Sequence, residues 1–273
     1  MIDTHAHLNF SAYKNDAEEV IKRTLADDIW LVNVGSQYST SKRAVEIAEQ
    51  YPEGVYAAIG LHPIHVKEEE SKSVRSFPSS LSQSESLLFD YEKYKELAKS
   101  KKVVAIGEIG LDYWYRPKGK AKLEEFKNRQ KEVFSKQIIL AKNLSLPVII
   151  HCRMAHRDLA EILDDKVDGV IHCFSGTWQE AQKYLEMGFS LGFNGIIFKL
   201  QLDEIIEKTP LDRILLETDC PYLTPPPMSG RNEPLYVKYI ADKVAKIKGL
   251  SCEEISDITS KNAIKLFNLH DHI

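Results

Sequence analysis

The sequence has few cysteines, no long hydrophobic run and no excess of positive charge. Its cysteines lack any CxxC spacing, which excludes a disulfide scaffold or a zinc knuckle and indicates a reducing compartment. Lysine and arginine number 36 against 40 acidic residues, so any polyanionic partner must be bound at a local site. The sequence has neither a leader-like start nor about 18 consecutive apolar residues, so we expect a soluble protein with no membrane partner. We expect it in the cytoplasm, and a nuclear pool stays open.

Short apolar, β-branched runs alternate with longer amphipathic segments, which is typical of repeated βα units. The predicted strands cover 1–5, 29–34, 55–61, 103–109, 146–151, 169–173, 189–194 and 213–218. The clearest predicted helices cover 16–26, 41–50, 123–144, 178–187 and 234–248. Units of about 34 residues match a barrel of about 250 residues. No GxGxxG follows the first strand. The sequence therefore predicts an α/β protein in which residues 1–273 form a single (β/α)8 TIM barrel.

Residues 67–90 interrupt this alternation with a segment rich in serine, glutamate and lysine. We expect a surface insertion here. Composition of this kind is typical of a solvated loop without chemical role. A lid over the barrel mouth or a site for a partner stays open as the alternative.

Histidines and carboxylates recur at the carboxyl ends of the predicted strands, which share one face of a parallel barrel. They are His5, His7, His62, Glu108, His151, His172 and Asp219. His5 and His7 lie two apart on an extended segment and point to the same side, as a metal site requires. Imidazole and carboxylate suit zinc, manganese, iron or nickel. Their number exceeds the need of one ion, which predicts two ions bridged by Glu108.

The motifs in this order resemble the TatD-like metal-dependent deoxyribonucleases of the amidohydrolase superfamily. They are THAHLNF at 4–10, GLHP at 60–63, VVAIGEIGLDY at 103–113, PVIIHCR at 147–153, IHCFSG at 171–176, LLETDCPYL at 215–223 and GRNEP at 230–234. The resemblance implies a divalent-metal hydrolase of DNA phosphodiesters, commonly a 3′–5′ exonuclease, with DNA, single-stranded or frayed at its 3′ end, as partner. It assigns His5, His7, Glu108, His151, His172 and Asp219 to the metal site. It implies activity with Mg²⁺, whereas the histidines favour ions such as Mn²⁺ or Zn²⁺.

Two carboxylates are the predicted catalytic residues. Asp219 is expected to hold one ion and accept the proton of the attacking water, while Glu108 bridges the ions. A plain ligand or a helix N-cap is the alternative for Asp219. Glu217 points to the same side and is expected either to orient a histidine or to be purely structural. Cys152 and Cys173 each follow a ligand histidine, so alternation turns their side chains away from the metal.

Substrate contacts are predicted beside these ligands. Arg153 and His62 are placed to hold phosphate, the alternatives being a surface ion pair and a packed loop residue. Tyr113 and Arg116 belong to the aromatic and cationic segment after Glu108, of a type that stacks on single strands. Packing of that segment onto the next helix is its alternative.

Two other functions stay open at this point. An amidohydrolase acting on a small amide, lactone or phosphoester is disfavoured because Glu108 stands where many such enzymes carry a lysine. A scaffold or binding protein that keeps metal for stability is the second alternative, and the complete ligand set argues against it.

Overall fold

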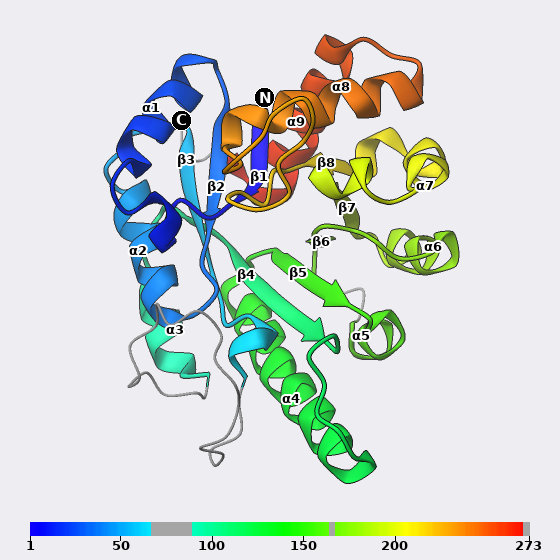
Figure 1. The fold of residues 1–273 in the computed structure, drawn as a ribbon. Coiled ribbons are helices and arrows are strands. Elements are labelled where there is room, and N and C mark those ends of the chain that lie inside the picture. Colours follow the sequence, from blue (N-terminus) through cyan, green and yellow to red (C-terminus); the bar gives the residue numbers. More distant parts are fainter. Residues whose placement is uncertain (67–88, 164–166, 270–273) are drawn as a thin grey trace.

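The computed structural model describes residues 1–66, 89–163 and 167–269, and shows eight parallel strands surrounded by helices (Figure 1). Each strand pairs with the next in the order β1 to β8, which confirms the predicted (β/α)8 barrel. The strands are β1 Ile2–Ala6, β2 Trp30–Val34, β3 Val55–Ile59, β4 Val103–Asp112, β5 Val148–Arg153, β6 Gly169–Ile171, β7 Ser190–Phe193 and β8 Ile214–Leu216.

The helices lie around the outside of the strands, as crossover connections of parallel strands must. They are α1 Ala17–Ala26, α2 Tyr38–Ala48, α3 Tyr91–Leu97, α4 Lys120–Leu144, α5 His156–Ile162, α6 Trp178–Glu186, α7 Asp203–Lys208, α8 Val237–Lys248 and α9 Cys252–Phe267. Strands covered in this way are buried on both faces, and every residue of β3 and β4 is buried. Their apolar, β-branched composition follows from that burial.

Four helices were not among those predicted from periodicity: α3, α5, α7 and α9. The long α9 begins with a capping box, in which Ser251 Oγ accepts from Glu254 N and the Glu254 carboxylate accepts from Ser251 N. The predicted insertion at 67–90 falls mostly outside the described residues. Its last residue, Asp90, caps α3 by accepting a hydrogen bond from Lys93 N.

The barrel closes between its first and last strands through a short set of contacts. A single parallel bridge joins Ala6 to Cys220, and His7 N donates to Cys220 O at 2.9 Å. Asp219 N donates to His5 O at 2.8 Å. The residues that close the barrel are therefore three predicted metal ligands and their immediate neighbours in the chain.

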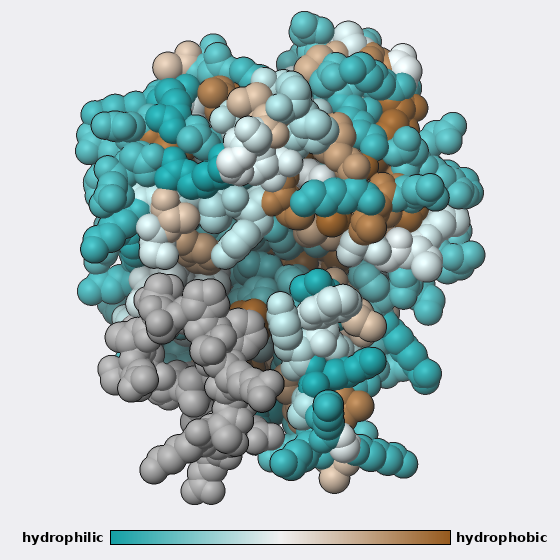
Figure 2. Space-filling view, viewed as in Figure 1, coloured by the Kyte–Doolittle hydropathy of each residue, from teal (hydrophilic) through white to brown (hydrophobic). Residues whose placement is uncertain are grey.

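One face of the molecule is mostly polar (Figure 2). Figure 2 shows that hydrophilic residues cover most of the face turned to the viewer and that hydrophobic ones gather mainly in its right-hand half. Among the described residues, the helices are too short or too polar to cross a lipid bilayer.

Candidate metal centre

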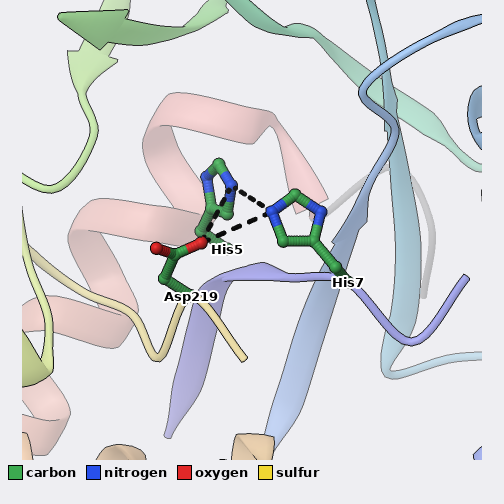
Figure 3. A group of neighbouring side chains, drawn as sticks. All are labelled: His5, His7 and Asp219. Atoms are coloured by element: carbon green, nitrogen blue, oxygen red, sulfur yellow. Dashed lines mark hydrogen bonds and ion pairs between the residues drawn. The ribbon is translucent and has the colours of Figure 1, made fainter. Parts of the chain in front are cut away.

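Three predicted ligands from the two ends of the chain point toward one another at the seam, the place where β1 and β8 meet and close the barrel (Figure 3). His5 lies in β1, His7 follows that strand, and Asp219 follows β8. The Nε2 atoms of the two histidines are 3.1 Å apart. Asp219 Oδ1 is 3.4 Å from His7 Nε2 and 4.0 Å from His5 Nε2. These atoms converge closely enough to share one cation.

Glu108, buried on β4, lies between this group and two more histidines. Its Oε2 is 3.5 Å from His5 Nε2 and 3.8 Å from His7 Nε2. Its Oε1 is 2.9 Å from His151 Nδ1 and 3.8 Å from His172 Nε2. The structure thus brings all six predicted ligands together, and the two oxygens of Glu108 face different pairs of histidines.

A hydrogen bond behind His7 and an ion pair behind His172 set which ring nitrogen faces the centre. His7 Nδ1 is 2.8 Å from the carbonyl of Val34, so it carries the proton and leaves Nε2 with a free lone pair. His172 Nδ1 is 2.9 Å from Glu217 Oε1, which likewise leaves Nε2 facing Glu108. Glu217 is fully buried. Its contact with His172 agrees with the expectation that it orients a histidine.

His62 lies in the same cluster, but its Nε2 is set to donate a hydrogen bond. Its Nδ1 accepts a hydrogen bond from Ile64 N at 3.0 Å, so the neutral ring carries its proton on Nε2. That Nε2 is 3.3 Å from Glu108 Oε1. Burial lowers the pKa of His62. A neutral donor facing the carboxylate suits contact with a substrate oxygen better than metal ligation.

Asp112 is a site residue that the sequence reasoning missed. Its Oδ2 is 3.0 Å from His151 Nε2, which directs the other ring nitrogen to Glu108. The predicted strand ended at 109, whereas β4 continues to Asp112. Because alternate residues of a strand share a face, Glu108 and Asp112 line the same side. A strand extended through Gly110 would have revealed it.

The charges of the cluster favour ionised carboxylates. Burial opposes ionisation of Glu108, but the surrounding His62, His151 and His5 hold its pKa well below the usual range. Burial likewise opposes ionisation of Asp219, but the contact with His7 and the charges of His172 and His5 together outweigh it, so its pKa is lowered. These carboxylates are therefore anionic at neutral pH.

The histidines divide into two kinds. Burial, reinforced by His172, lowers the pKa of His5 to about 4, so this ring is neutral. For His151 and His172 burial acts in the same direction, but the carboxylates outweigh it. Asp112 and Glu108 raise the pKa of His151 to about 9, and Glu217 helps raise that of His172 to about 10. Without metal, protons occupy part of the cluster.

The donor atoms fit a divalent metal centre. His5 Nε2 and His7 Nε2 are 3.1 Å apart, a distance that needs a proton or a cation between the two nitrogens. The His5 and His172 rings stack with centroids 3.5 Å apart. Atoms of Glu108, His151 and the neighbouring His62 also lie within 4.8 Å of one another, although His62 itself is set to donate a hydrogen bond. Such imidazole and carboxylate sets bind zinc and related ions.

Predicted residues outside this cluster have mixed outcomes. Arg153 and Arg116 are exposed beside the mouth, as a phosphate contact requires. Tyr113 is only 3% exposed and donates its hydroxyl to Asp158, so the expectation that its ring meets substrate is wrong. Cys173 adopts a φ of 48°, which breaks strand alternation. Its thiol lies near His172 and Asp219, whereas it was expected to point away; Cys152 is in the core as expected.

Comparisons with known proteins agree with this geometry. The family model described as TatD related DNase matches residues 2–268. An uncharacterized metal-dependent hydrolase, YabD of Bacillus subtilis, is 42% identical over 99% of this chain and 100% of its own length. The 3′–5′ ssDNA/RNA exonuclease TatD of Pantoea vagans is 34% identical over 98% of this chain and 100% of its own.

A solved structure shares the fold. The crystal structure of the TatD homolog YjjV from Escherichia coli superposes with a TM-score of 0.81 at 28% identity, covering 98% of both chains. The family match spans every strand of the barrel and every residue of the metal cluster. The chain therefore belongs to the family of TatD-related DNases, metal-dependent hydrolases that act on ester bonds.

Proposed function

We propose that this chain is a deoxyribonuclease that removes nucleotides from single-stranded 3′ ends of DNA, using two divalent ions. The ions are Mg²⁺, Mn²⁺ or Zn²⁺. Family membership supports the nuclease class, and the name of the Pantoea vagans relative supports the direction and the single-stranded substrate.

One observation carries the two-ion part of the proposal: the two oxygens of Glu108 face different histidines. Oε2 lies toward His5 and His7, and Oε1 lies toward His151 and His172. A carboxylate in this position can bind two cations at once. When bound, two such ions lower the pKa of a water molecule and neutralise charge on a phosphoryl group.

The side chains of the cluster have distinct roles in this proposal. Asp219 Oδ1 accepts the proton of the attacking water, since the neighbouring histidines keep this carboxylate ionised. Glu217 holds the His172 ring in position. His62 donates from Nε2 to a phosphoryl oxygen. Arg153 and Arg116, both exposed at the mouth, hold nonbridging phosphate oxygens.

The test is digestion of a single DNA strand labelled at its 5′ end, with Mg²⁺, Mn²⁺ and Zn²⁺ supplied in turn. We expect a ladder that shortens from the 3′ end. Glu108→Ala and Asp219→Ala abolish this ladder, because each removes a carboxylate that lies close to several of the predicted histidine ligands. Glu124→Ala, at an exposed glutamate of α4, is the matched control and leaves the ladder unchanged.

An intact strand with all three metals would refute the proposal. Turnover of lactones or small phosphoesters in place of DNA would instead favour a small-molecule hydrolase. The absence of any turnover, together with metal that only raises thermal stability, would favour a scaffold protein.

A further inference from the structure

Most of the large hydrophobic side chains that are exposed lie in the segments that follow the carboxyl ends of the strands. In the described part of the chain, all but one follow the carboxyl end of a strand, and the exception, Ile139, lies on α4. Those at the mouth are Ile64, Trp114, Tyr115, Met154, Leu200 and Tyr222. These segments form the end of the barrel that carries the site, so an apolar group there can meet a ligand of the site.

Trp114 is distinguished among them by its partner. The Arg153 guanidinium lies over its indole ring, 4.2 Å from the centroid, in a cation–π stack. Trp114 is nevertheless 52% exposed, so the indole keeps surface that a flat ligand can cover. Among the described residues Arg153 forms no salt bridge, and its positive charge remains available beside the ring.

A short chain of contacts joins this pair to the metal centre. Asp112 accepts a hydrogen bond from Trp114 N at 2.8 Å through Oδ1, and its Oδ2 is 3.0 Å from His151 Nε2. Tyr113 N donates to the Arg153 carbonyl at 2.9 Å, which fixes the two segments together. The pair therefore sits at a fixed position beside His151.

We propose that Trp114, backed by Arg153, is a stacking platform for the unpaired DNA base next to the phosphate at the metal centre. The inference rests on the proposed function and extends it to a specific site. Every base offers a π-face, so the platform binds without sequence preference, while the guanidinium beside it attracts the backbone phosphate. An abasic nucleotide keeps the phosphate and loses the stack.

The experiment measures binding rather than turnover. Fluorescence anisotropy with Mg²⁺ follows a labelled single DNA strand whose last linkages are phosphorothioates, so that cleavage does not interfere. Two strands of equal charge are compared, one with a 3′-terminal base and one ending in an abasic nucleotide. We expect wild-type protein to prefer the base by roughly five- to 150-fold, the range that removal of one stacking aromatic produces.

Trp114→Ala is expected to remove this preference and Trp114→Phe to keep most of it. Ile139→Ala is the matched control, because Ile139 is 53% exposed but lies on α4, away from the mouth. Equal binding of both strands by wild-type protein, or an undiminished preference in Trp114→Ala, overturns the platform. Thermal melting of each variant confirms that it is folded.

Digestion of an unmodified strand distinguishes failure of the stacking platform from failure of the proposed nuclease function. Cleavage by wild-type protein without any base preference refutes the platform and leaves the nuclease intact. Base-dependent binding without cleavage retains the platform and refutes the nuclease.

Discussion

Replacing Glu217 by glutamine tests whether a residue behind the ligands sets metal affinity. Glu217 is fully buried, and its Oε1 is 2.9 Å from His172 Nδ1. The same oxygen accepts hydrogen bonds from Cys173 N at 2.7 Å and Asn194 Nδ2 at 3.1 Å. Glu217→Gln keeps the size of the side chain and removes its negative charge.

The size of the effect follows from these contacts. An amide nitrogen at the Oε1 position would face three donors, so the glutamine oxygen must take that place and the hydrogen bonds survive. Only the charge that makes His172 more basic is lost. Removal of a carboxylate behind a metal-bound histidine typically lowers metal affinity by about 10- to 100-fold. We expect the lower end, about tenfold, which is about 1.4 kcal/mol.

Competition for Zn²⁺ against a chromophoric chelator at fixed pH measures the change. Glu124→Gln, an exposed glutamate on α4, makes the same chemical change away from the centre and is expected to bind like wild type. Thermal melting without metal separates lost folding from lost affinity. A folded Glu217→Gln protein with wild-type Zn²⁺ affinity would refute the reasoning.

Three further predictions follow from neighbouring contacts. Gly192→Ala places a Cβ 2.5 Å from Glu217 Oε2, so it should lower Zn²⁺ affinity in the same competition assay; unchanged affinity would contradict that contact. Thr218→Val leaves the buried Asp3 carboxylate short of a donor and should cost about 1–3 kcal/mol in denaturant unfolding, against less for Thr224→Val, whose hydroxyl donates to the exposed Gly230 carbonyl. Zn²⁺ binding should displace protons from His151 and His172, whose pKa values are about 9 and about 10. Apparent affinity should therefore fall as pH falls below about 10, and more steeply below about 9, and calorimetry should give different heats in buffers of different ionisation enthalpy; identical heats would argue against it.

The barrel and the six clustered side chains were predictable because both depend on local patterns. A buried parallel strand is apolar along its length, and its carboxyl end opens onto one common face, so a polar residue there is conspicuous. His151 and His172 each end such a run. Short helices such as α5 and α7 have too few turns to display a periodicity, and they were missed for that reason.

Other features of the site depend on the backbone in ways that alternation does not reveal. Cys173 adopts a positive φ, and its thiol turns toward the centre. Tyr113 adjoins exposed aromatic residues in sequence, yet its ring packs inward under Lys127. Asp112 lies beyond a glycine that normally signals the end of a strand. In each case the dihedral angles of one residue, or the extension of a strand by a few residues, decide the contact.

The contacts that close the barrel also set the positions of the ligands in the metal centre. Asp3 Oδ1 accepts from the backbone N of both His5 and Thr218, at 3.2 Å and 2.9 Å. Thr218 then accepts from Cys220 N, on the other side of Asp219, whose φ is 57°. Because β1 and β8 meet through these few bonds, a shift at the seam must change the distance between His5 and Asp219. Folding of the last strand against the first thereby determines whether these ligands can share a metal ion.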